Sequence, residues 1–139
     1  MNRDHTVRWA GDLQFVGTAG SGQSLVIDGD KKVGMSPMEM LLLAAGACAA
    51  IDLVTILKKG RQKVMDATVE VGGERRDEHP RYYTAVAMHF VVYGKDVDPK
   101  RVERAIDLAM EKYCSASAQL KALATMDTSY EIVEAELPT

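Results

Sequence analysis

Short runs of alternating apolar and polar residues open the chain and predict a small antiparallel β-meander. Turn signals separate the runs, because Gly11 precedes an aspartate and Gly29 lies between two aspartates. The three predicted strands cover 6–9, 13–16 and 24–27.

A nearly continuous apolar stretch follows and predicts one long helix from Ser36 to about Leu57. Ser36 is a favourable N-cap, Pro37 suits the first helical position, and Glu39 lies at the capping-box position. Two lysines and a glycine then form a typical helix end. The helix would be roughly 33 Å long. Because it is apolar almost all round, we expect most of it to be buried, inside a wrapped sheet or against a second copy of itself.

The second half of the chain carries patterns for two strands, two helices and a closing strand. Apolar residues at helical spacing follow Asp98 and Pro99, which favour a helix start. Ser115 or Ser117 would cap the short helix that comes next. Grouped strands separated by helices indicate an α+β fold, and no linker or repeat divides the chain, so we expect a single domain over 1–139. The predicted elements are strands at 67–72, 82–93 and 129–134 and helices at 98–113 and after 114.

Composition and charge exclude several classes of function. The 139 residues include 17 lysines and arginines against 20 aspartates and glutamates, a net charge of −3, which provides no basic surface for nucleic acid. The longest uncharged apolar run, 40–51, is shorter than the roughly 20 residues that span a bilayer, and no signal-peptide core opens the chain. We therefore expect a cytoplasmic protein that binds neither nucleic acid nor a membrane.

Two cysteines are the main candidates for chemistry. Cys48 lies mid-helix among small residues at 44–50, which leave room for another helix or for a ligand that reaches the sulfur. Cys114 directly precedes a predicted helix start, where free N–H groups would stabilise its thiolate and lower its pKa. Neither their spacing nor a nearby histidine pair suggests zinc, so we expect no metal and no other cofactor. Two interpretations stay open at this point: a redox pair, or two inert core residues.

Both cysteines stand in motifs that resemble those of one family, OsmC/Ohr, which comprises osmotically inducible protein C and the organic hydroperoxide resistance proteins. The family's central helix resembles the run Ser36-Pro37-Met38-Glu39-Met40-Leu41 followed by Ala44-Ala45-Gly46-Ala47-Cys48. Its second cysteine motif resembles Cys114-Ser115-Ala116-Ser117-Ala118. Within the family, the YhfA-like branch is the most similar, through 36–40, Glu74-Arg75-Arg76 and 111–115.

The resemblance implies a fold, an assembly and a reaction. The fold is an antiparallel sheet wrapped around a long buried central helix, in a tightly intertwined homodimer. In active members the first cysteine attacks an organic hydroperoxide, the second condenses with the resulting sulfenic acid, and a dithiol reduces the disulfide. Carried over to this chain, the resemblance makes Cys48 the peroxidatic residue, Cys114 the resolving residue and Glu39 a third catalytic residue.

Two positions depart from the family pattern. Ungapped counting puts Met38, not Glu39, at the place of the catalytic glutamate. On a straight helix Glu39 would lie about 13.5 Å along the axis from Cys48 and on the opposite side. It would therefore act across a dimer contact or from a frayed first turn, or serve only as a cap. The turn at 19–23 lacks the family's arginine, and substitutes would come from Arg8, Arg75, Arg76 or Arg81.

The sequence also offers other candidate residues and functions. Asp52 lies one helical turn from Cys48, on the same face of the helix. Its negative charge would raise the pKa of the Cys48 thiol, so it would help catalysis only by holding a cation in place. The alternative is that Asp52 is a hydrogen-bonded acid of the core. A catalytically silent relative would bind an apolar small molecule at the dimer interface. A hotdog-type thioesterase would use Glu39 or Asp52 as its carboxylate. The three histidines lack metal-ligand spacing, and methionines at 35, 38 and 40 fit core filling better than a substrate mouth.

Overall fold

The computed structural model describes residues 1–136 of the chain. Contacts between Cα atoms separate it into two compact units, Met1–Leu41 and Leu42–Thr139. Each unit has its own sheet. The single domain expected from the sequence stays a prediction.

The first unit contains the predicted meander. Its strands β1 (Thr6–Trp9), β2 (Gln14–Thr18) and β3 (Ser24–Asp28) pair antiparallel in the order β1-β2-β3. The turn between β1 and β2 places Gly11 at φ 101° and Asp12 at φ 45°, a conformation that glycine and aspartate tolerate better than other residues. The prediction of three short strands joined by tight turns is confirmed.

Asp28 organises the loop that leads from β3 to the long helix. Its buried carboxylate accepts backbone N–H bonds from Asp30 at 2.8 Å and from Lys32 and Val33 at 3.0 Å. The bond from Val33, followed by that from Asp30, holds the pKa of Asp28 below its usual range. These bonds satisfy backbone donors in a loop that has no ladder of its own.

Helix α1 (Pro37–Lys59) begins and ends where the sequence predicts. Its capping box is formed, because Ser36 N donates to Glu39 Oε1 at 3.0 Å and Glu39 N donates to Ser36 Oγ at 3.3 Å. The helix is long and apolar enough to cross a membrane, judged by length and composition alone. Within unit Leu42–Thr139, however, it packs its buried residues against a sheet, as the core helix of a globular protein does.

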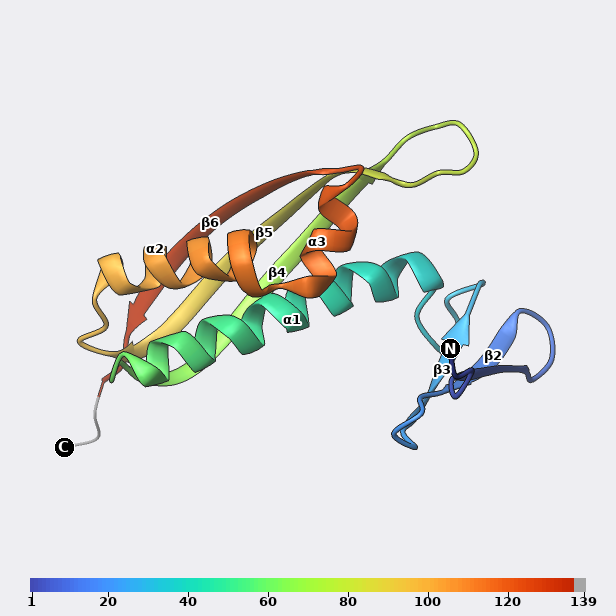
Figure 1. The fold of residues 1–139 in the computed structure, drawn as a ribbon, viewed down its shortest axis with the longest axis horizontal. Helices are drawn as coiled ribbons and strands as arrows, with labels where there is room; N and C mark the ends of the chain where they lie inside the picture. Colours follow the sequence, from blue (N-terminus) through green and yellow to red (C-terminus); the bar gives the residue numbers. More distant parts are fainter. Residues whose placement is uncertain (137–139) are drawn as a thin grey trace. The chain divides into compact units, whose positions relative to one another are not determined.

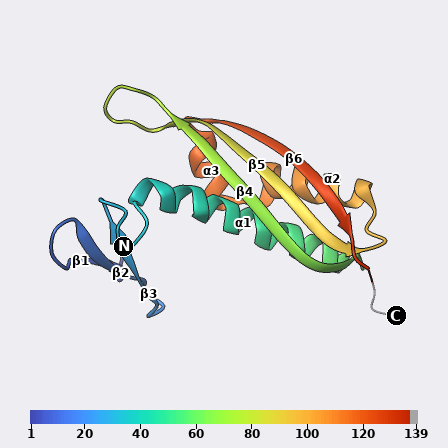
Figure 2. The ribbon, with the colours of Figure 1, turned by 180° about the vertical axis from the view of Figure 1, so that it is seen from behind.

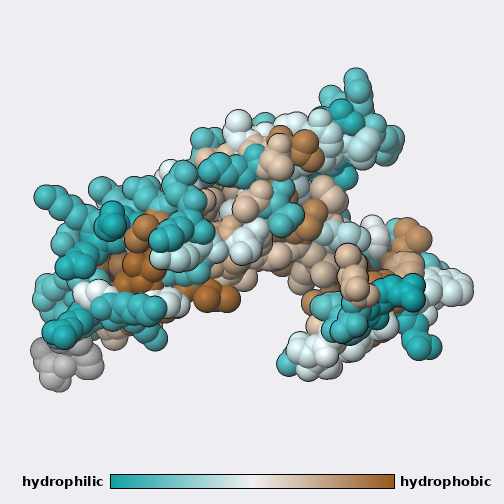
Figure 3. All heavy atoms as spheres, in the orientation of Figure 1, coloured by the Kyte–Doolittle hydropathy of each residue, from teal (hydrophilic) through white to brown (hydrophobic). Residues whose placement is uncertain are grey.

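A single chain buries only part of α1, so the expectation that most of the helix is buried stays a prediction that depends on a second copy of the helix. Only Ala45, Gly46, Ala49, Leu53 and Leu57 are buried. Large apolar side chains elsewhere on the helix remain exposed, Leu43 to 53% and Ile51 to 66%. Figure 3 shows apolar atoms gathered along the surface over α1. The chain therefore leaves an apolar strip of this helix uncovered.

The second unit is built on three long strands. Strand β4 (Lys63–Arg75) pairs antiparallel with β5 (Tyr83–Lys95), and β5 pairs parallel with β6 (Thr125–Glu134). The sequence predicts all three, but with shorter bounds, because their ends carry charged and polar residues that interrupt the apolar pattern. A parallel pair cannot be joined by a tight hairpin, so a helical crossover must connect β5 to β6.

That crossover comprises α2 (Pro99–Leu108), the π-helical turn η1 (Ala109–Tyr113) and α3 (Ser115–Lys121). The crossover helices and the part of α1 in this unit cover one face of the sheet, while the other face stays open (Figures 1 and 2). The largest fully buried side chains include Leu53 and Leu57 of α1, Phe90 and Val92 of β5 and Val102 of α2. The core of the unit thus lies between the sheet and its helices.

Gly46 lets β4 approach the helix closely. A Cβ atom at this position would lie 2.6 Å from Cγ2 of Val71 on β4, closer than real Cβ contacts. Gly46 therefore makes room for a strand of the same chain, in agreement with the sheet that the sequence predicts against this helix.

We expect Gly46→Ala to destabilise the protein. Valine has little rotamer freedom, and overpacking a core costs about 1–3 kcal/mol, partly offset by about 1 kcal/mol of helix propensity gained. Denaturant unfolding should show a net loss of about 1 kcal/mol, and a smaller loss in a Val71→Ala background. Gly72→Ala, where an added Cβ meets nothing within 4 Å, is the matched control. An equal cost of Gly46→Ala in both backgrounds would contradict the proposed contact.

Candidate functional site

The fold brings the two cysteines and one aspartate to a single place in unit Leu42–Thr139. The sulfurs of Cys48 and Cys114 and a carboxylate oxygen of Asp52 all lie within 4.8 Å of one another. Both cysteines are free thiols. A disulfide would require the two sulfurs to come to about 2.05 Å of each other.

Cys48 and Asp52 share one face of α1 because they lie one helical turn apart. Cys114 comes from the junction between η1 and α3, where its extended backbone (φ −74°, ψ 95°) ends one helix and starts the next. Its N–H donates to Ala109 O at 2.7 Å, and its thiol points at Ala45 O on α1, 3.7 Å away. The junction is thereby held against the helix that carries Cys48.

Cys114 itself is the N-cap of α3, so the expectation that Ser115 or Ser117 caps this helix is wrong. Its sulfur accepts the N–H of Ser117 at 3.4 Å, the bond that a serine side chain would otherwise supply. Ser115 and Ser117 lie inside α3. Serine is a preferred N-cap residue and cysteine is not, so the sequence pattern favours the two serines.

Burial raises the pKa of the Cys114 thiol, against the expectation from its place at a helix start. Cys114 is 3% exposed and Ser117 is 1% exposed, so the thiolate would lose most of its hydration. The hydroxyl of Ser117, 2.9 Å from the sulfur, and the Ser117 N–H lower the pKa but offset only part of the effect of burial. The neighbouring Cys48 raises it further. Cys114 is therefore a protonated thiol near neutral pH.

Asp52 is held in an unusual environment. Its Oδ2 atom is out of contact with solvent and has no hydrogen-bond partner among the described residues. The sequence suggested either a hydrogen-bonded core acid or a carboxylate that holds a cation. Leaving a buried carboxylate oxygen unpaired costs free energy, so this atom is an unsatisfied acceptor beside the two thiols.

The side chain of Glu39 takes part in the capping box at the start of α1. Its carboxylate accepts the N–H of Ser36, and this bond, with that from the Ser36 hydroxyl, lowers the pKa of Glu39. The capping role expected from the sequence is confirmed, while the catalytic role stays a prediction.

Three of the four candidate arginines bind the loop between β4 and β5. Arg75 Nε donates to Arg81 O at 2.7 Å, Arg76 Nε donates to Pro80 O at 2.8 Å, and Arg81 Nε donates to Arg76 O at 3.2 Å. The Arg76 guanidinium also lies over the Tyr82 ring, 4.2 Å from its centroid. These guanidinium groups hold the loop closed in this structure.

Comparison with known proteins decides the family. The family model described as OsmC-like protein matches residues 28–129. The chain belongs to the OsmC-like family. It is 46% identical over 130 residues to Protein YhfA of Escherichia coli K12, covering 93% of this chain and 97% of that protein.

Solved structures agree with the OsmC-like fold. A hypothetical protein from Aquifex aeolicus VF5 is 31% identical, with a TM-score of 0.87 and coverage of 98% of this chain and 99% of that one. The organic hydroperoxide resistance protein OhrB of Bacillus subtilis is 18% identical, with a TM-score of 0.60 and coverage of 91% and 97%. The second comparison shows the fold alone, and both agree with the α+β architecture expected from the sequence.

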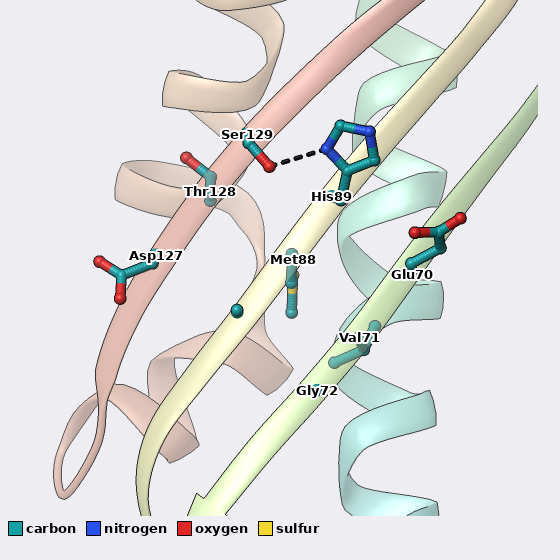
Figure 4. Close-up of a pocket in the computed structure, with 9 residues that line it drawn as sticks. Glu70, Val71, Gly72, Met88, His89, Asp127, Thr128 and Ser129 are labelled. Atoms are coloured by element: carbon teal, nitrogen blue, oxygen red, sulfur yellow. Dashed lines mark hydrogen bonds between the residues drawn. The ribbon is translucent and has the colours of Figure 1, made fainter.

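A hollow of about 420 Å³ on the open face of the second sheet is a separate feature of this OsmC-like chain. His89 lies there beside Ser129, and its Nδ1 is 2.7 Å from the serine Oγ (Figure 4). The two residues are direct partners in the β5–β6 register, and His89 Nε2 is also 3.8 Å from Glu131. The histidine thus links neighbouring strands of the sheet.

Removing the Ser117 hydroxyl should make Cys114 less reactive. Its hydrogen bond favours the thiolate, so Ser117→Ala raises the pKa of Cys114 further and moves its alkylation by iodoacetamide to higher pH. Peptide-level mass spectrometry of the reduced protein should show a several-fold slower reaction at Cys114 near pH 8. Ser115→Ala, at an exposed position of the same helix, is the control. An unchanged pH profile for Ser117→Ala would contradict this role.

Proposed function

We propose that this OsmC-like chain reduces organic hydroperoxides through Cys48 and Cys114, in defence against oxidative stress. The observation that carries the proposal is the position of the two free sulfurs, within 4.8 Å of each other on packed elements. Sequence spacing alone leaves open whether the thiols meet. Family membership adds support, because relatives with this fold include organic hydroperoxide resistance proteins.

In the first step the Cys48 thiolate attacks the distal oxygen of the hydroperoxide. The O–O bond breaks, the sulfur becomes sulfenic acid, and the alkoxide takes a proton and leaves as an alcohol. In the second step the Cys114 sulfur attacks the sulfenic sulfur, an S–S bond forms, and the hydroxyl leaves as water. A dithiol then reduces the disulfide by thiol–disulfide exchange and is itself oxidised.

Exposure supports this division of roles. Cys48 is half-buried and Cys114 is almost fully buried, so a hydroperoxide from solvent reaches Cys48 first. The raised pKa of Cys114 keeps it protonated, which suits a residue that reacts only after Cys48 has been oxidised. Nearby resolution protects the sulfenic acid from irreversible oxidation.

In this proposal Glu39 acts on the Cys48 site of a second subunit and not on that of its own chain. Its distance from Cys48 along α1, about 13.5 Å on a straight helix, prevents it from reaching that sulfur in the same chain while the first turn stays helical. A Glu39 carboxylate from a partner would orient the peroxide or take a proton. We therefore propose that the reacting protein is the homodimer.

Substitution of each cysteine should give a different kinetic defect. With cumene hydroperoxide and dithiothreitol, Cys48→Ser should consume peroxide no faster than buffer. Without dithiothreitol, which would itself reduce a sulfenic acid, Cys114→Ser should consume about one equivalent per chain and leave Cys48 as sulfenic acid, which a second equivalent of peroxide oxidises to sulfinic acid because no resolving thiol is present.

The exposed Asp107→Asn on α2 is the control and should keep full turnover. Peroxide consumption that survives in Cys48→Ser would refute the proposed mechanism. Thioester hydrolysis by a variant lacking both cysteines would favour the thioesterase instead. A lack of both activities, with an apolar molecule retained on purification, would favour the silent binding protein.

The uncovered strip of α1 supports the homodimer. Leu43 and Ile51 are exposed on a helix whose other face is packed, and a second copy of the same helix would cover them. Self-association of this kind is isologous, so one substitution changes both sides of the contact.

Ile51→Glu should convert the dimer into monomers. Two carboxylates introduced into an apolar contact should raise the dissociation constant at least about 100-fold, equivalent to about 3 kcal/mol. Size-exclusion chromatography with light scattering measures the change. Lys100→Glu, at an exposed position of α2, should stay dimeric. A wild-type chain that is monomeric at high concentration would contradict the proposed assembly.

A further inference from the structure

We propose that the reduced protein binds one Zn²⁺ ion between Cys48, Asp52 and Cys114. The three side chains offer two sulfurs and one carboxylate oxygen, all within 4.8 Å of one another. This site goes beyond the proposed peroxidase function, since metal binding requires no peroxide and no turnover.

The distances suit a zinc site after small side-chain adjustments. With Zn–S bonds of about 2.3 Å and Zn–O bonds of about 2.0–2.2 Å, tetrahedral ligands lie roughly 3.5–3.8 Å apart. The three ligand atoms lie up to 4.8 Å apart, so each must move by about 1 Å to reach these distances, and rotation of the side chains supplies such a movement. Three protein ligands leave the fourth position for water or another small ligand, as in zinc sites that stay open.

The state of Asp52 is the second, independent observation. A carboxylate oxygen that is withdrawn from solvent and has no hydrogen-bond partner in residues 1–136 needs a compensating charge. Asp52 also lies one turn from Cys48 on a regular helix, so its side chain is held on the face of α1 that carries the thiol. A cation at this place would bind the Asp52 carboxylate and neutralise the two sulfurs together.

The chemistry of the three ligand atoms, two sulfurs and one carboxylate oxygen, determines which metal ion the site prefers. Thiolates favour zinc and other soft or borderline ions over Mg²⁺ and Ca²⁺, which require oxygen ligands. Two thiolates and one carboxylate carry three negative charges, which a divalent ion reduces to one. The ligands come from positions 48, 52 and 114, so the site has no short spacing motif that a sequence would reveal.

Metal and disulfide exclude each other, because both use the same two sulfurs. If the proposed peroxidase function holds, Zn²⁺ would inhibit it by occupying the nucleophile, and oxidation to the disulfide would release the ion. The metal site stands without that function, since its measurement is made in the absence of hydroperoxide.

The test is titration of the reduced full-length protein with Zn²⁺ alone, against a chromophoric chelator. We expect about one equivalent per chain. Asp52→Asn, which preserves the size of the side chain, should weaken binding at least by the roughly 10–100-fold that loss of an outer-sphere partner costs. Cys48→Ser and Cys114→Ser should weaken it further, and Asp107→Asn should leave it unchanged.

A second measurement needs no variant. One equivalent of Zn²⁺ should protect the accessible Cys48 of the wild-type protein from alkylation by iodoacetamide, and oxidation to the disulfide should abolish zinc binding. Failure of the reduced wild type to bind, alkylation unaffected by zinc, or equal affinity in Asp52→Asn would each overturn the proposed site. Peroxide consumption without zinc binding would overturn the metal site while leaving the peroxidase intact.

Discussion

The rest of the site depends on the contact between the Cys114 junction and helix α1. This junction is where a π-helical turn gives way to α3, and the sulfur of Cys114 serves as the cap of the new helix. The thiol lies 3.7 Å from Ala45 O, a carbonyl one turn before Cys48. Ala45 itself is fully buried, so a larger residue there would overpack the core next to this contact.

The same contact sets the chemical difference between the two cysteines. Burial of Cys114 in the core removes water from the sulfur and raises the pKa of the thiol, although Cys114 lies at the start of a helix. Cys48, on the helix surface beside it, stays half-buried. One accessible and one protected thiol at short range is an arrangement that suits sequential oxidation, and the buried Asp52 oxygen beside them suits a cation when the thiols are reduced.

Much of the fold could be predicted from local patterns, because caps and periodicity are local. Ser36, Pro37 and Glu39 place the start of α1, and alternating residues place the strands. The burial of α1 could not be predicted, because it depends on how much of the helix one chain covers. Leu43 and Ile51 look like core residues in the sequence but are exposed in a single chain.

For the site, residue types and motifs identify Cys48 and Cys114, but distance across a fold cannot be read from a separation of 66 positions. The bond between Ser117 and the thiol could have been predicted, because its place three residues after Cys114 fits the hydrogen bond of a helix cap.

The most direct measurement is free-thiol counting with intact mass after one equivalent of cumene hydroperoxide, in the absence of added reductant. Loss of both thiols and of two hydrogen atoms in mass, without a covalent dimer, is the result that the account predicts. Two free thiols, or an oxidised Cys48 beside a free Cys114, would contradict it.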